Sequence, residues 1–259
     1  METNNSRIRM IRSYALLALP LLSLVSCGVT SGGGAPGLPP RKAPPDIFDS
    51  YYPDRDANMA DGWTRGMDMS GVSFNDTRTA TLITPRHVVM AKHYSRPAGA
   101  PVVFHDRGGN RIKRKIIGFA PASGDVMVAL LDEPVPSNYR SYPLPSTSTN
   151  SAAIIGRHAI ISDQNRKLFV HLVAGIERGI IGFKQDESDT HGWGKNLVVG
   201  DSGNPAFLIA GNQLVLVETH TNGGSGSGPY YGDPTVQASI RAAVAKLDGS
   251  YRIHTVMVR

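Results

Sequence analysis

The chain has 259 residues, of which 41% are hydrophobic and 19% are charged, so it can bury a sizeable core and is not a disordered protein. Its 28 glycines and 18 prolines favour a β-rich fold with many turns over a helical bundle. The net charge of +6 is spread along the chain, so we expect no nucleic-acid binding. A single cysteine, Cys27, excludes an intramolecular disulfide.

The N-terminal segment has the pattern of an export signal. Three arginines precede an apolar stretch at residues 14–25, which is shorter than the roughly 20 residues needed to span a bilayer. The stretch ends in LVSCG at residues 24–28, which resembles a bacterial lipobox. This resemblance implies a signal peptide over residues 1–27 and a lipid on Cys27 that anchors an exported protein to the membrane of a bacterial cell envelope. The alternative is an ordinary signal peptide with an incidental cysteine.

Gly28 follows the cysteine, without the aspartate associated with inner-membrane retention, so we expect the outer membrane or the cell surface. Residues 28–45 are rich in Gly, Pro and Ser, which is typical of a flexible tether. Residues 46–62 show no clear period, and we expect them to be irregular. The folded domain is predicted over residues 63–259.

From residue 63 onward, short apolar runs alternate with turn signals. Many short strands at such spacing favour an antiparallel sandwich or barrel over alternating strands and helices. The predicted strands cover residues 79–84, 87–91, 101–105, 115–119, 126–131, 152–155, 159–162, 169–174, 179–183, 205–209 and 214–218.

One α-helix is predicted near the C-terminus. Asp233 can cap its first turn, Pro234 suits the first helical position and Gly249 can end it. Four apolar residues between positions 236 and 247 share one face at helical spacing. Residues 253–258 could form one more strand.

The motif GDSGNP at residues 200–205 carries the strongest chemical signal. A serine nucleophile needs a tight turn whose backbone N–H groups can receive a developing oxyanion, and glycines at 200 and 203 permit such a turn. Asn204 excludes the G-x-S-x-G elbow of α/β-hydrolases. The segment resembles the G-D-S-G-x-P motif of trypsin-like (chymotrypsin-fold) serine proteases, with Ser202 as the nucleophile. A surface turn is the alternative.

Residues 81–93, TLITPRHVVMAKH, resemble the strand–turn–strand run that leads into the catalytic histidine of this family. The family's run ends in A-A-H, and here Lys92 stands in place of the second alanine. The resemblance makes His93 the general base. His87 is the competing candidate, but it lies where the family has a turn residue.

Residues 124–131, GDVMVALL, resemble the family's D-I-A-L-L segment, in which the aspartate begins a buried strand. Asp125 can accept the Nδ1–H of the histidine and stabilise the imidazolium. Asp106 and Asp132 are interpreted as solvated turn charges. The three segments follow in the order His, Asp, Ser.

The resemblance covers roughly residues 63–247. It implies an all-β fold of two antiparallel six-stranded β-barrels with a C-terminal α-helix, the first barrel carrying His93 and Asp125 and the second Ser202. The backbone N–H groups of Gly200 and Ser202 would form the oxyanion hole. The implied activity is hydrolysis of protein or peptide substrates through an acyl-enzyme, by a monomer without metal or cofactor.

Two departures from the family bear on activity. No I-V-G-G activation sequence precedes the first barrel, so Asp201 needs a partner other than a freed N-terminal amine. Together with Lys92, this leaves open a catalytically silent chymotrypsin-fold module that binds peptides or envelope partners. A structural envelope lipoprotein is a third hypothesis.

The resemblance places the specificity pocket at Asn196 and at residues Thr219, His220 and Thr221. Asn196 supplies no carboxylate, so we expect no preference for Lys or Arg. His220 could favour acidic side chains, or it could simply be a strand residue. The remaining histidines show no metal-ligand spacing.

Overall fold

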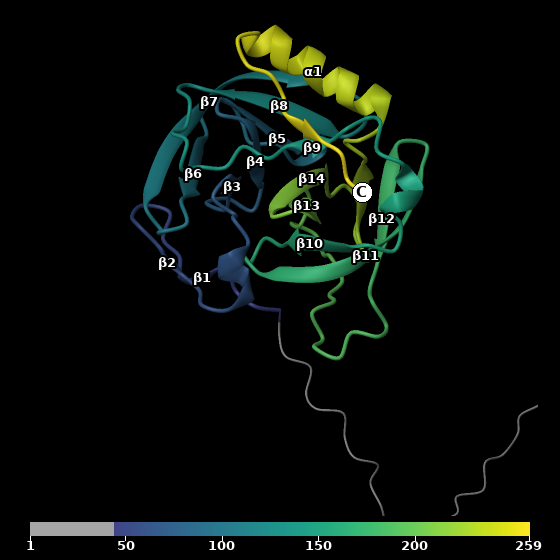
Figure 1. The fold of residues 1–259 in the computed structure, drawn as a ribbon. Coiled ribbons are helices and arrows are strands. Elements are labelled where there is room, and N and C mark those ends of the chain that lie inside the picture. The colour runs from purple at the N-terminus through teal and green to yellow at the C-terminus, as the bar shows by residue number, and fades with distance from the viewer. Residues whose placement is uncertain (1–43) are drawn as a thin grey trace, which may run out of the picture. The chain divides into compact units, whose positions relative to one another are not determined.

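A computed structural model describes residues 44–259 (Figure 1), all of which belong to one compact unit, Pro40–Arg259. The predicted signal peptide, the predicted lipidation residue Cys27 and residues 28–43 of the predicted tether lie outside the described residues. These three assignments stay predictions from the sequence.

The first half of the described chain forms a six-stranded antiparallel sheet in the order β3-β4-β5-β8-β7-β6. Apolar side chains from strands β4 to β8 meet in the interior of this sheet, so the sheet encloses a core as a barrel does. Its strands are β3 (Val72–Ser73), β4 (Ala80–Thr84), β5 (His87–Ala91), β6 (Pro101–His105), β7 (Arg111–Pro121) and β8 (Val126–Leu131).

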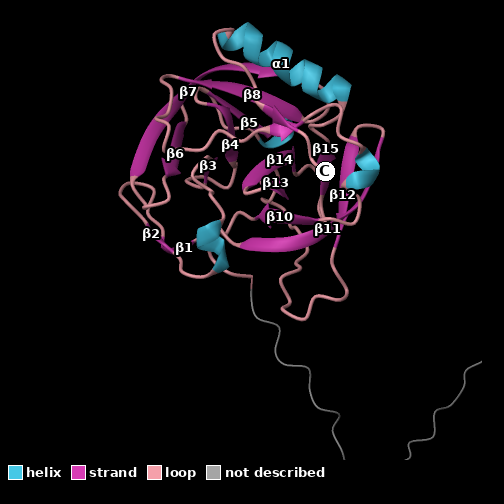
Figure 2. Cartoon of the chain, viewed as in Figure 1, coloured by secondary structure: helices cyan, strands magenta, loops and turns pink. Residues whose placement is uncertain are grey.

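The second half forms another six-stranded antiparallel sheet, in the order β14-β13-β10-β11-β12-β15. The predicted fold class, two six-stranded antiparallel barrel-like sheets with one C-terminal helix, is confirmed for the described residues (Figure 2). The strands are β10 (His158–Ser162), β11 (Leu168–Glu177), β12 (Ile180–Lys184), β13 (Pro205–Ala210), β14 (Gln213–Thr219) and β15 (Ser227–Pro229).

The pleat of the strands explains how the two sheets share a core. Successive side chains of a strand point to opposite faces. Leu82 of β4 therefore packs inside the first barrel while its neighbour Ile83 packs in a cluster common to both halves. In the second sheet, Phe207 of β13 joins this common cluster and Leu208 points inside the barrel. Strands buried on both faces thus hold the two barrels against each other.

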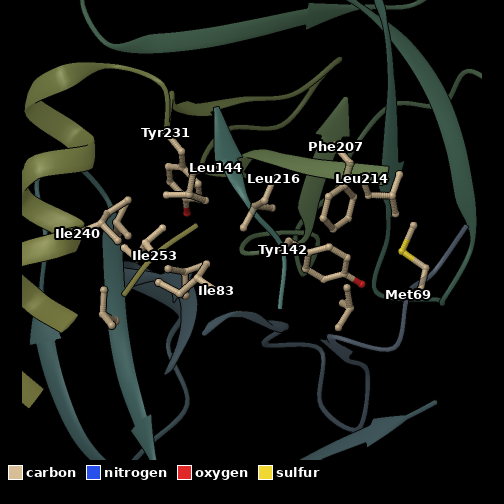
Figure 3. Packing of buried hydrophobic residues seen from close by; sticks show 14 of the residues in the cluster. Met69, Ile83, Tyr142, Leu144, Phe207, Leu214, Leu216, Tyr231, Ile240 and Ile253 are labelled. Atoms are coloured by element: carbon tan, nitrogen blue, oxygen red, sulfur yellow. The ribbon is translucent and has the colours of Figure 1, made fainter. Parts of the chain in front are cut away.

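Figure 3 shows this common cluster around Tyr142, which lies on the segment that connects the two sheets. The rings of Tyr142 and Phe207 are 4.6 Å apart between centroids, and the Tyr142 hydroxyl donates to the carbonyl of Asp68 at 2.7 Å. The same segment contains β9 (Leu144–Pro145), which pairs in parallel with β16 (Thr255–Val256).

The predicted helix is α1, Pro234–Asp248, and it lies over β7 and β8 of the first sheet (Figure 1). Its predicted cap is present, because Asp233 Oδ1 accepts from the amides of Thr235 at 2.9 Å and Val236 at 3.0 Å. Gly249 follows the last helical residue, although its φ of −70° is not left-handed. The apolar face of α1 joins the common cluster.

Two regions differ from expectation. Residues 152–155 were expected to form a strand, but a 3₁₀ turn, η3 (Ser151–Ala153), occupies this position because the Asn150 side chain caps the amide of Ala152 at 3.0 Å. Upstream of residue 63, the expected irregular segment contains the strands β1 (Phe48–Ser50) and β2 (Asn58–Met59), followed by the 3₁₀ turn η1 (Trp63–Gly66). Ile47 is buried there and its amide donates to Arg166 at 2.9 Å, so the folded unit begins before residue 63.

Candidate active site

His93 lies where β5 leaves the first barrel, on the short 3₁₀ turn η2 (Lys92–Tyr94). Strand β8 runs antiparallel to β5 with Ala91 opposite Val126, so the residue before β8 lies beside the residues after β5. The backbone joins the two strand ends, since the Lys92 amide donates to the Asp125 carbonyl at 2.9 Å. The His93 amide donates to Asp125 Oδ1, also at 2.9 Å.

The three side chains predicted to be catalytic form one hydrogen-bonded line. Asp125 Oδ2 accepts from His93 Nδ1 at 2.5 Å, and His93 Nε2 lies 3.0 Å from Ser202 Oγ. With the proton on Nδ1, Nε2 is the lone-pair acceptor for the serine hydroxyl. The Asp125 side chain is 17% exposed and that of His93 is 48% exposed, so the carboxylate is sheltered while the imidazole remains accessible to a substrate.

Lys92, the residue that departs from the family's pattern, is exposed and its Nζ donates to the Gly124 carbonyl at 3.1 Å. This contact adds a third link between the ends of β5 and β8. The ammonium thus binds the loop before Asp125 and leaves the bond between His93 and Ser202 intact.

Ser202 reaches the first barrel because the loop around it can come very close to β5. At Gly203, where φ is +84°, a Cβ would lie 3.3 Å from the Ala91 amide nitrogen and 3.4 Å from the Thr79 carbonyl oxygen. Glycine suits this close approach, and its positive φ is a backbone conformation that other residues rarely adopt. Asn204 then joins the two halves, because its Oδ1 accepts from the Thr79 hydroxyl at 2.9 Å.

The two predicted oxyanion donors have no protein acceptor. Among residues 44–259, neither the amide of Gly200 nor that of Ser202 donates a hydrogen bond. The preceding carbonyl of Val199 accepts from Gln164 Nε2 at 2.9 Å, which fixes the orientation of the peptide group that ends in the Gly200 amide. The amides on either side of Asp201 are therefore available to an anionic oxygen.

Asp201 is buried, and its carboxylate organises the loop before Ser202. Its Oδ2 accepts from the Val198 amide at 2.9 Å, and its Oδ1 accepts from the Gln164 amide at 3.1 Å. The ammonium of Lys195 lies 3.7 Å from Oδ2 and also forms a close ion pair with the buried Asp163. Lys195 therefore supplies the positive charge for two buried carboxylates.

The sequence did not predict three residues that support the serine loop, namely Lys195, Asp163 and Gln164. Asp163 and Gln164 lie in the turn between β10 and β11, far from the serine motif in the chain, and their residue types are ordinary for a turn. The sequence offered one signal for them, namely that Asp201 needs a partner other than a freed N-terminal amine.

Of the four residues predicted to form the specificity pocket, the structure places one beside Ser202. His220 lines a small cavity of about 20 Å³ next to Ser202. Thr219 instead forms a buried hydrogen bond with the Tyr231 hydroxyl at 2.7 Å, and Asn196 is exposed and accepts from Gln185. Neither these two residues nor Thr221 belongs to the cavity lining.

His220 lies close to Glu218, with 2.5 Å between Nδ1 and Oε1, and both side chains are buried. Neither nitrogen of His220 and neither carboxyl oxygen of Glu218 has a hydrogen-bond partner among the described residues. Burial raises the pKa of Glu218, and the nearby His220 opposes this shift.

His87, the competing histidine, begins β5 and is buried. Its Nδ1 lies 2.8 Å from the Thr84 hydroxyl, and its ring packs edge-on against Tyr251. Desolvation by burial lowers the pKa of His87 to about 4. The structure therefore places it in the interior, away from the line of Asp125, His93 and Ser202.

No family model matches the chain, and no curated protein matches it either. In the described part of the chain, no helix is both long enough and apolar enough to cross a membrane. Residues 44–259 also contain no cluster of three or more His, Cys, Asp or Glu side chains placed to hold a metal ion.

Proposed function

We propose that the protein is a serine endopeptidase of the trypsin-like type, with Ser202 as nucleophile, His93 as general base and Asp125 as the group that orients the histidine. The observation that carries this proposal is the hydrogen-bonded line from Asp125 Oδ2 through His93 to Ser202 Oγ, with bonds of 2.5 and 3.0 Å. The free amides of Gly200 and Ser202 beside it support the same reading.

Acylation begins when Ser202 Oγ attacks the carbonyl carbon of a peptide bond and its proton passes to His93 Nε2. Asp125 stabilises the imidazolium through the bond to Nδ1–H. The amides of Gly200 and Ser202 receive the oxyanion. When the C–N bond breaks, the leaving amine takes the proton from Nε2, and an ester on Ser202 remains.

Deacylation repeats these steps with water. His93 Nε2 takes a proton from a water molecule whose oxygen bonds to the ester carbon. The bond to Ser202 Oγ then breaks and Oγ recovers a proton from the imidazolium, which releases the acid. The loss of one oxyanion donor typically costs about 10²–10³ in rate, so the fixed peptide group before Gly200 matters for the chemistry.

A polypeptide substrate suits the surroundings of the serine. Val198 and Val199 are 56% and 100% exposed, and they form an apolar surface beside Ser202. The cavity next to the nucleophile is too small for a whole small-molecule substrate, whose pockets typically have about 300 Å³ or more. An extended chain can instead lie across the surface with one side chain in the cavity.

Labelling with an alkyl fluorophosphonate tests the proposal, because the probe loses fluoride as a bond forms between phosphorus and an activated serine oxygen. We expect labelling of the folded protein, none of Ser202→Ala, and unchanged labelling of Ser188→Ala, whose serine lies in an exposed turn. Absence of labelling in the folded wild-type protein would overturn the proposal and favour a non-catalytic binding module.

A further inference from the structure

A small cavity lies beside Ser202. It has a volume of about 20 Å³ and is lined by Leu197, Val198, Asp201, Ser202, His220, Asn222 and Gly223. A cavity of this size holds about one water molecule, which is also about the size of a methyl or hydroxymethyl group.

Leu197 is the main reason for the small volume. Its side chain is buried in the core of the second barrel, and its amide donates to the Gly224 carbonyl at 2.7 Å. A Cβ placed on Gly226 would lie 2.8 Å from Leu197 Cδ1 and 3.0 Å from His220 Cε1. Leu197 and His220 therefore pack directly against the backbone of the glycine-rich segment, and both also line the small cavity beside Ser202.

Charge reinforces this size limit. The carboxylate of Asp201 already accepts from two backbone amides and faces Lys195. His220 Nδ1 already lies 2.5 Å from Oε1 of the buried Glu218. An acidic substrate side chain would approach the carboxylate of Asp201 in the cavity lining, and a long basic side chain would exceed the volume of the cavity.

We infer that the cavity binds the side chain of the residue that precedes the cleaved bond, and that the enzyme selects glycine, alanine or serine at this position. This inference rests on the proposed function and replaces the expectation that His220 favours acidic side chains. A rigid site discriminates by about 10–200-fold for one methylene group. We therefore expect alanine to exceed leucine and phenylalanine by at least about 100-fold in kcat/KM.

The first experiment uses the wild-type protein and peptide amides that differ only in the residue before the cleaved bond, namely Gly, Ala, Ser, Leu, Phe, Lys and Glu. Highest kcat/KM for the three small residues supports the inference. Highest kcat/KM for Glu, Lys, Leu or Phe overturns it while leaving the proposed function intact.

The second experiment compares Leu197→Ala with Leu208→Ala, which removes a buried leucine from the same core but not from the cavity lining. Leu197→Ala should raise kcat/KM for leucine at least about 10-fold relative to alanine, whereas Leu208→Ala should leave the ratio unchanged. An unchanged ratio in a folded Leu197→Ala variant contradicts the inference.

Fluorophosphonate labelling of every variant distinguishes failure of the specificity inference from failure of the proposed function. A protein that is labelled but prefers large residues has the proposed chemistry with a different pocket. A folded protein that is not labelled lacks the proposed chemistry, and the inference falls with it.

Discussion

His93 and Asp125 lie at the ends of adjacent strands, whereas Ser202 lies in a loop that contacts Lys195 and the distant Gln164. The first pair follows from the register of β5 and β8 and is reinforced by backbone hydrogen bonds. The serine loop depends instead on Lys195 and Gln164. Five residue pairs hold β5 against β8, whereas few side chains support the serine loop, so we expect the second half of the site to be the more fragile half.

Asp125→Asn is expected to produce the largest effect, and it alters only the first half of the site. An amide at this position cannot both keep the bond to the His93 amide and accept from Nδ1–H, so the imidazole loses its correct tautomer. We expect kcat to fall by about 10⁴, with little change in thermal stability. Steady-state kinetics on an alanine-containing peptide amide measure this.

Asp132→Asn is the matched control, because Asp132 follows the other end of β8 and its carboxylate accepts from the amides of Lys115 and Glu133. It should leave kcat unchanged. An Asp125→Asn protein that retains more than a tenth of the wild-type kcat would exclude Asp125 from the proposed role.

The two halves of the site also differ in how well the sequence predicted them. Apolar runs and turn residues are local signals, and they predicted strands such as the one that begins at Val126 and an antiparallel sandwich or barrel. The two six-stranded barrels and the pair His93 and Asp125 came from the resemblance to a family's motifs, and the structure brings these two side chains together. The strand expected at residues 152–155 failed because a single asparagine side chain decided the local conformation.

The support of the serine loop could not be predicted in this way. The contact of Lys195 with Asp163 joins two loops, and neither residue belongs to a periodic pattern. The size of the cavity likewise depends on how Leu197 packs against Gly226, which is a property of tertiary structure alone. Sequence motifs thus named the proposed reacting groups, whereas the residues that surround and support them are visible only in the tertiary structure.

Lys195→Met tests the fragile half directly. It leaves the buried carboxylates of Asp163 and Asp201 without their cation, which typically costs about 3–5 kcal/mol in the free energy of unfolding. If the loop shifts, the oxyanion donors are misplaced and kcat should fall by about 10²–10³ with a smaller change in KM. Urea unfolding and kinetics on the fraction that remains folded measure the two effects.

Lys195→Arg keeps the positive charge and should retain most of the wild-type kcat. That result would show that residue 195 acts through its charge and not merely through the packing of its side chain. Lys167→Met is the control for loss of a lysine, because Lys167 pairs with a half-exposed Asp46. This surface pair is worth at most about 1 kcal/mol. Equal kcat values in folded Lys195→Met and wild-type protein would show that Lys195 does not position the serine loop.

The smallest expected effect concerns His87, which shares β5 with the residues that lead to His93 but has the opposite environment. Thr84 Oγ1 accepts from the amides of Arg86 and His87, so its own proton goes to His87 Nδ1, and the ring is neutral with its proton on Nε2. Burial lowers the pKa of His87 to about 4, with Asp248 opposing this shift and Arg86 adding to it.

Because the unfolded chain binds this proton near pH 6.5 and the folded chain only near pH 4, the free energy of unfolding should fall as the pH drops through that window. The contribution of His87 is about 3 kcal/mol at its limit. Urea unfolding between pH 7 and pH 4 gives the slope of the free energy of unfolding against pH. In His87→Gln this slope should be smaller by the equivalent of about one bound proton. Val89→Ala, a destabilising change on the same strand, should keep the wild-type dependence of the free energy of unfolding on pH. The wild-type dependence in His87→Gln would show that a group other than His87 takes up the proton.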